Sequence, residues 1–221
     1  FYPLLGCRAA YAPHRENRVM QVALSINAQG GKEARDLVLR APRIVGNGGI
    51  VHMDVHGASF QGVMVPKGMR TEVHLMVRDW ETRLTPWFEA GAFRVVIPAD
   101  YMDAVSMRRA RKVAARYGAV IMPSFSYADD TVDFSPYAGF AAFQILAVPA
   151  GKSGQAFDVR AIGKIKALRA AFPDAILEVD GGMTPLTTAH AKEAGADIIV
   201  SFSCIWNAES PHEAYEKLVR I

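Results

Sequence analysis

The sequence predicts an α/β fold, specifically a (β/α)8 TIM barrel, and three observations support this prediction. Short segments rich in β-branched residues alternate with amphipathic stretches from about residue 20 onward. Eight strand segments can be distinguished, which is the number that the barrel requires. The length of 221 residues suits one large domain or two small ones. We therefore expect an N-terminal extension over 1–19 and a single barrel domain over 20–221.

The elements follow from hydrophobic periodicity and from the residues that end each segment. The predicted strands cover 22–26, 50–55, 72–77, 93–97, 119–122, 143–148, 175–179 and 197–200. The predicted helices cover 32–45, 79–90, 99–117, 158–172, 185–194 and 211–219. We expect Pro42 to interrupt the first helix and Asp79 to cap the second. Pro173 is expected to end the helix 158–172.

One connection departs from an ideal barrel. Residues 56–71, between the second and third strands, hold three glycines, a proline and no helical period. The second helix is therefore expected to be shortened or missing, either because the loop is short or because a segment of the natural chain is absent. An open doubly wound sheet is the alternative fold, but no Gly-x-Gly-x-x-Gly fingerprint follows the first strand.

Composition excludes several classes of protein. Apolar residues make up 51% of the chain, so global disorder is excluded, and no apolar run approaches the roughly 18 residues of a membrane span. The net charge is only +3, and a basic cluster at Arg108, Arg109, Arg111 and Lys112 has the spacing of a solvated helix face, so we expect no nucleic-acid partner. Cys7 and Cys204 form no metal or disulfide pattern, and 1–5 is too short for a secretory signal. These features predict a cytoplasmic protein.

Polar residues gather where three predicted strands end. His52 and Asp54 are two residues apart and so share one face of a strand, while His74 and Asp180 lie on other strands. Two imidazoles and two carboxylates at one barrel mouth would suit one divalent ion of Zn, Fe, Mn or Co. Taken singly, a strand histidine is more often a core residue, and a strand-end aspartate is often a helix cap. Spacing alone leaves both interpretations open.

Glycine-rich loops follow the last three strands. They contain Gly151 and Gly154, the pair Gly181 and Gly182, and Ser203. Loops at these places in a barrel commonly hold a phosphate through backbone N–H groups. Ordinary turns would also explain the glycines.

At these residues the chain resembles the ribulose-phosphate 3-epimerase family. Residues 73–77 match the family's Val-His-Leu-Met-Val, and residues 178–182 match its Glu-Val-Asp-Gly-Gly. Residues 52–55 resemble its His-x-Asp-Val, and Ser25 stands at the serine of its Pro-Ser-Ile-Leu. Further likenesses lie at 148–157, 194–197 and 202–206, so the resemblance runs from about residue 20 to the C-terminus.

The resemblance implies an isomerase of carbohydrate metabolism in the pentose phosphate pathway. It would invert C3 of D-ribulose 5-phosphate to give D-xylulose 5-phosphate through an enediolate, with Asp54 and Asp180 as the acid and base. One divalent metal ion would be held by His52, Asp54, His74 and Asp180. The sugar phosphate would contact Ser25, His74, Met76, Gly151, Gly154, Gly181, Gly182 and Ser203. Barrels of this family commonly self-associate, so a homo-oligomer is expected.

The chain departs from the family pattern around the substrate. His56 and Leu146 stand at methionine positions, Gly57 at an aspartate, and Phe202 at the glycine of a phosphate loop, while Lys152 adds a charge. These changes leave an epimerase for another sugar phosphate, such as a hexulose 6-phosphate, and a non-catalytic sugar-phosphate binder as alternatives. A lyase of the same barrel superfamily is disfavoured, because 54–58 lacks the lysine and second aspartate of the Asp-x-Lys-x-x-Asp run.

Overall fold

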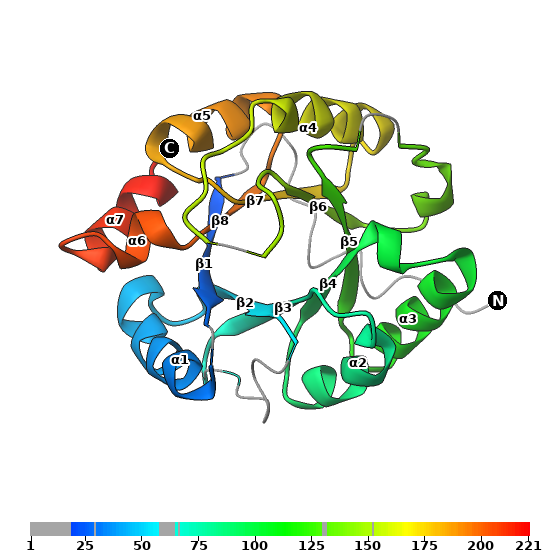
Figure 1. Cartoon of the computed structure of the whole chain (residues 1–221), viewed down its shortest axis with the longest axis horizontal. Helices are drawn as coiled ribbons and strands as arrows, with labels where there is room; N and C mark the ends of the chain where they lie inside the picture. Colours follow the sequence, from blue (N-terminus) through cyan, green and yellow to red (C-terminus); the bar gives the residue numbers. More distant parts are fainter. Residues whose placement is uncertain (1–18, 29, 58–64, 66, 130–131, 152) are drawn as a thin grey trace.

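Eight parallel strands form one closed barrel in a computed structural model that describes residues 19–28, 30–57, 65, 67–129, 132–151 and 153–221 (Figure 1). Each strand pairs with the next along the chain, and β8 pairs with β1. The strands are β1 (Gln21–Asn27), β2 (Ile50–Val55), β3 (Arg70–Leu75), β4 (Arg94–Pro98), β5 (Val120–Ser126), β6 (Ala142–Leu146), β7 (Ile176–Asp180) and β8 (Ile198–Ser201). The predicted (β/α)8 barrel is therefore confirmed.

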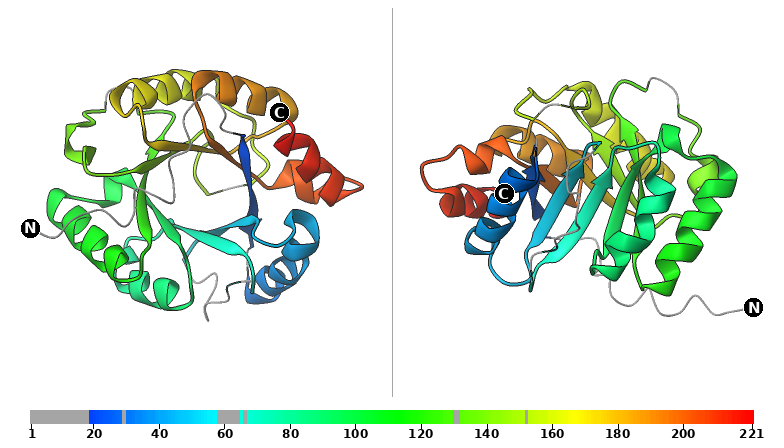
Figure 2. Two further views of the ribbon diagram at one scale, coloured as in Figure 1. Left: turned by 180° about the vertical axis from the view of Figure 1, so that it is seen from behind. Right: turned by 60° about the horizontal axis from the view of Figure 1, so that its bottom comes forward.

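Helices surround the barrel and cover its outer face (Figure 2). They are α1 (Gly31–Val45), α2 (Trp80–Glu89), α3 (Ala104–Arg116), α4 (Arg160–Ala171), α5 (Pro185–Ala194), α6 (Ser203–Trp206) and α7 (Pro211–Val219), with 3-10 helices η2 (Ala99–Tyr101) and η3 (Ser135–Tyr137). Side chains that alternate along each strand point to the helices or to the barrel interior. All six residues of β2 are buried as a result.

Two predicted helices have different bounds in the structure. The interruption at Pro42 was wrong, because α1 continues to Val45 and the Gly46 N–H still donates to the Pro42 carbonyl. The proline lies in the last turn, where few backbone bonds remain for it to disrupt. The predicted helix 99–117 divides at Asp103, whose side chain accepts from the backbone N–H groups of Val105 and Ser106 and starts α3 there.

Some sequence-based predictions lie partly outside the described residues. Between β2 and β3 the described positions 56–57, 65 and 67–69 contain no helix, as expected. Residues 1–18, 58–64 and Lys152 are not described, so the boundary of the N-terminal extension stays a prediction. None of the helices described is both long and apolar enough to cross a membrane.

Candidate metal centre and active site

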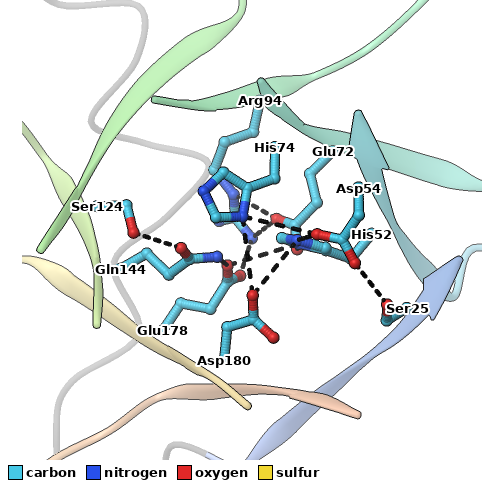
Figure 3. Close-up of polar contacts among 10 residues, drawn as sticks. All are labelled: Ser25, His52, Asp54, Glu72, His74, Arg94, Ser124, Gln144, Glu178 and Asp180. Atoms are coloured by element: carbon cyan, nitrogen blue, oxygen red, sulfur yellow. Dashed lines mark hydrogen bonds and ion pairs between the residues drawn. The ribbon is translucent and has the colours of Figure 1, made fainter. Parts of the chain in front are cut away.

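The four residues selected from the strand ends come together at the mouth of the barrel (Figure 3). His52 and Asp54 lie on β2, His74 on β3 and Asp180 at the end of β7. His52 Nε2 lies 3.3 Å from Asp54 Oδ1 and 3.9 Å from Asp180 Oδ2. His74 Nδ1 lies 3.7 Å from both of these carboxylate oxygens. Parallel strands in register place all four at one end of the sheet.

The donor set fits a divalent ion. One ligand atom from each residue lies within 4.8 Å of the ligand atoms of the other three. His52 Nε2 and His74 Nδ1 are buried and have no hydrogen-bond partner among the residues that the structure describes. A buried nitrogen without a partner is costly, and two imidazoles with two carboxylates suit Zn²⁺, Fe²⁺, Mn²⁺ or Co²⁺. The cluster therefore has the chemistry of a metal site, and within the described residues its two carboxylate-facing nitrogens have no other partner.

The charges of the cluster favour an ionised Asp54 and protonated histidines in the absence of a metal ion. Burial acts to raise the pKa of Asp54, but the charge and proximity of His52 and His74 outweigh it and hold that pKa far below its usual range. Burial acts to lower the pKa of His52, yet the charges and hydrogen bonds of Asp54 and Glu72 together raise it well above its usual value. The pKa of His74 is also raised, because its contacts with Asp180 and Asp54 outweigh the effect of burial.

A second polar layer lies beneath the cluster, inside the barrel, and sequence reasoning missed it. His52 Nδ1 donates to Glu72 Oε1 over 2.8 Å, and Arg94 Nε donates to Glu72 Oε2 over 2.7 Å. Arg94 Nη2 donates to Glu178 Oε2 over 2.9 Å. Two further bonds lead from Gln144 Nε2 to Glu178 Oε1 (3.0 Å) and from Ser124 Oγ to Gln144 Oε1 (2.6 Å).

Strand periodicity could have found two members of this layer. Glu72 precedes His74 by two residues, and Glu178 precedes Asp180 by two, so each shares a strand face with a selected residue. Burial acts to raise the pKa of Glu72, but the Arg94 guanidinium and the His52 imidazole together outweigh it and lower the pKa to about 2. Burial, together with the charge of Glu72, raises the pKa of Glu178 to about 8. The Glu178 carboxyl is therefore the one that keeps a proton near neutral pH.

A pocket opens above the cluster, and seven of the eight predicted substrate-binding residues line it. These are Ser25, Met76, Gly151, Gly154, Gly181, Gly182 and Ser203, whereas His74 is not among the lining residues. Asp54 and Asp180 form part of the same wall. Ser25 Oγ donates to Asp54 Oδ2 over 2.9 Å, and this bond orients the Asp54 carboxylate. Sequence reasoning did not select Asn27 and Gln155, which also line the pocket.

Close packing also explains why two glycines, Gly181 and Gly182, follow β7. A Cβ atom on Gly181 would lie 2.5 Å from Val148 Cγ2, and one on Gly182 would lie 2.3 Å from the backbone nitrogen of Phe157. Both glycines also have positive φ, at 102° and 67°. Only glycine lets the β7 loop pass this close to the segment after β6. Phe202, by contrast, has φ of −110°, which any residue can adopt.

Comparison with known proteins agrees with this geometry. Residues 46–206 match the model of the ribulose-phosphate 3 epimerase family. A ribulose-phosphate 3-epimerase from Mycobacterium bovis is 30% identical over 155 residues, which is 67% of this chain and 66% of that protein, slightly less than two thirds of its length. The Mycobacterium leprae enzyme of the same name is 27% identical over 194 residues, covering 80% of this chain and 85% of that protein.

A solved structure shares the fold. The 3-hexulose-6-phosphate synthase from Salmonella typhimurium superposes with a TM-score of 0.67, covering 91% of this chain and 97% of that chain, at 16% identity. That identity is too low to indicate more than a common barrel. The family match, in contrast, spans most of the barrel and includes all four residues of the cluster. The chain belongs to the ribulose-phosphate 3-epimerase family.

Proposed function

We propose that the protein is a metal-dependent epimerase that inverts C3 of D-ribulose 5-phosphate to give D-xylulose 5-phosphate. The observation that carries this proposal is that Asp54 and Asp180 line one pocket and also meet two buried histidines there. His52, Asp54, His74 and Asp180 would hold the ion. When bound, a divalent ion supplies positive charge that stabilises negative charge on the substrate oxygens.

The two aspartates would carry the proton. A proton on C3, next to the ketone, is weakly acidic, and one carboxylate removes it to leave a planar enediolate. The other aspartate, in its protonated form, then donates a proton to the opposite face of C3, and the configuration is inverted. The first carboxylate ends protonated and the second ionised, so the proton count balances. Ser25 keeps Asp54 oriented through its 2.9 Å hydrogen bond.

The rest of the pocket would hold the substrate. Backbone N–H groups around Gly151, Gly154, Gly181, Gly182 and Ser203 would bind the phosphate, since these residues line one side of the pocket. Ser25 and Met76 would contact the sugar from the other strands. His74 would act as a metal ligand and reach the substrate only through the ion.

A hexulose 6-phosphate is the second candidate substrate. His56, Leu146 and Phe202 all line the pocket, and all three differ from the family pattern. Changes confined to the substrate walls alter which sugar fits, while the proton-transfer residues stay in place. A panel of ketose phosphates would separate the two substrates.

The proposal is tested by exchange of the C3 proton with solvent deuterium, followed by NMR, in metal-loaded protein. Asp54→Asn and Asp180→Asn should each slow conversion by about 10²–10⁴-fold. Each variant keeps one of the two proton carriers, so it should still exchange deuterium into one epimer. The Asp54 and Asp180 variants should label opposite epimers. Metal content is measured alongside, since both residues are proposed ligands.

Asp36→Asn is the matched control, because Asp36 is exposed on α1 and pairs only with Arg40 among the ion pairs described. It should convert substrate as the wild type does. Metal binding without exchange on any ketose phosphate would contradict the proposal and favour the non-catalytic binder.

A further inference from the structure

Arg94 is a charged residue buried inside the barrel, outside the residues that line the pocket. It lies on β4, is 1% exposed and is not among the lining residues of the pocket. Its guanidinium donates to Glu72 through Nε and Nη2, and to Glu178 through Nη2. Burying a charged arginine is unfavourable unless several bonds compensate for the lost hydration, so its place inside the barrel calls for an explanation.

The bonds of Glu72 lead from Arg94 to the candidate metal centre. One carboxylate oxygen, Oε2, accepts from Arg94, and the other, Oε1, accepts from His52 Nδ1. A carboxylate accepts only, so Nδ1 is the nitrogen of His52 that carries the proton in this bond. The remaining nitrogen, Nε2, then faces Asp54 and Asp180 at 3.3 Å and 3.9 Å. Figure 3 shows this chain of contacts from Arg94 to the cluster.

We propose that Arg94 is a positioning residue for metal binding, which fixes the Glu72 carboxylate so that Glu72 turns His52 Nε2 toward Asp54 and Asp180. The inference rests on the proposed function, because it concerns the ion that the function requires. Arg94 would act mainly through Glu72, which bonds His52 Nδ1 at 2.8 Å, whereas Glu178, its other carboxylate partner, lies farther from that nitrogen at 3.8 Å. Partners that orient a ligating histidine commonly affect metal affinity by about 10–100-fold.

The same bonds argue against a second ion in this layer. His52, Glu72 and Glu178 also bring ligand atoms within 4.8 Å of one another. The guanidinium of Arg94 already binds both carboxylates, and His52 Nδ1 already donates to Glu72. The negative charge of this layer is thus neutralised by Arg94, and the layer orients His52 in the cluster above it.

The experiment is a double-mutant cycle on Zn²⁺ affinity, measured by competition with a chromophoric chelator on the full chain. Arg94→Met should weaken Zn²⁺ binding about tenfold, and Glu72→Gln should weaken it at least as much. The double variant should match Glu72→Gln to within about twofold, because most of the effect of Arg94 on His52 is expected to pass through Glu72. The electronic spectrum of the Co²⁺-loaded protein provides a second readout, and should change in each variant if ligand geometry is altered.

Arg169→Met is the matched control for the loss of an arginine from a well-bonded position. Arg169 lies on α4, and its Nη2 lies 2.6 Å from Asp197 Oδ2. Asp197 immediately precedes β8, at the N-terminal end of the strands, whereas the cluster lies at their C-terminal ends. Its loss should lower stability and leave Zn²⁺ affinity unchanged. Arg94→Lys keeps the charge but not the planar fork, and it is the variant to measure if Arg94→Met does not fold; it too should bind Zn²⁺ more weakly.

The outcomes separate the two proposals. Wild-type protein that binds no divalent ion would overturn the proposed function and this inference together. Wild-type protein that binds Zn²⁺ and exchanges the C3 proton, while the Arg94 variants keep its affinity, would overturn the inference alone. Additive effects of Arg94→Met and Glu72→Gln would also overturn it, because they would show that Arg94 does not act through Glu72.

Discussion

His52 uses its two ring nitrogens in different ways. Nδ1 donates to the carboxylate of Glu72 over 2.8 Å, while Nε2 lies 3.3 Å from Asp54 without a hydrogen-bond partner. Strand position identified His52 as inward-facing, because it shares a strand face with Asp54. It could not identify which nitrogen faces the cluster, since that depends on Glu72, which comes from the neighbouring strand.

The buried carboxyl pair predicts how stability changes with pH. Glu178 has its pKa raised to about 8 from 4.5, so the folded protein holds a proton that the unfolded chain releases. Its contribution to the free energy of unfolding is fully present below pH 4.5 and is lost as pH rises toward 8. The raised pKa values of His52 and His74 act in the same direction above pH 6.5.

We therefore expect the metal-free protein to lose stability as pH rises through this window. Glu178→Gln should flatten the decline without abolishing it, because glutamine cannot release the proton while the histidines still titrate. Urea unfolding with a chelator present, at several pH values between 4.5 and 8, measures this slope. Glu193→Gln, exposed on α5, is the control and should retain the wild-type slope. An equal slope in Glu178→Gln would show that Glu178 is ionised in the folded protein.

At the scale of elements, helix starts depend on single capping residues that periodicity does not resolve. The predicted helix 99–117 has an unbroken apolar pattern, yet α3 starts only after Asp103. Asp103 and Ser106 each bond the other's backbone in a capping box. Asp79 is the N-cap residue of α2, as predicted, but its side chain makes no cap bond and accepts instead from Arg83.

These two aspartates provide a prediction with its own control. Asp103→Ala should lower the free energy of unfolding by about 0.5–2 kcal/mol, because two backbone N–H groups at the start of α3 lose their acceptor. Asp79→Ala removes only an exposed ion pair and should cost less than about 1 kcal/mol. Urea denaturation of both variants measures the difference. Equal losses would contradict the assignment of Asp103 as the stronger cap.

At the scale of the whole molecule, barrel closure brings β2, β3 and β7 to one site. Asp54 and Asp180 are far apart in the sequence, and they meet because β8 pairs with β1 and closes the sheet. The interior is also charged, with Glu72, Arg94 and Glu178 almost fully buried. A bound cation would therefore complete a site that the fold has already assembled.

Metal binding should accordingly stabilise the whole barrel. An ion that binds only the folded state at a hundredfold excess over its Kd adds about 2.7 kcal/mol to the free energy of unfolding. Thermal unfolding with Zn²⁺ and with a chelator should differ by the corresponding shift in Tm. The His52→Ala variant should show a much smaller shift, and an equal shift in that variant would place the ion elsewhere. Sedimentation of the same samples tests the expected homo-oligomer, which stays a prediction, as does the cytoplasmic location.

The barrel and its eight strands could be predicted from the sequence, and the four residues of the cluster were candidates by strand position and by family resemblance. Alternation within strands and polar residues at strand ends are local signals, and the order of the strands follows once a parallel sheet is assumed. The polar layer beneath the cluster became evident only from the tertiary structure. Arg94, Gln144 and Ser124 lie in segments that are otherwise apolar, and nothing local shows what they bond. Most of their partners come from neighbouring strands, and Glu178 on β7 reaches Arg94 on β4 across the interior of the closed barrel.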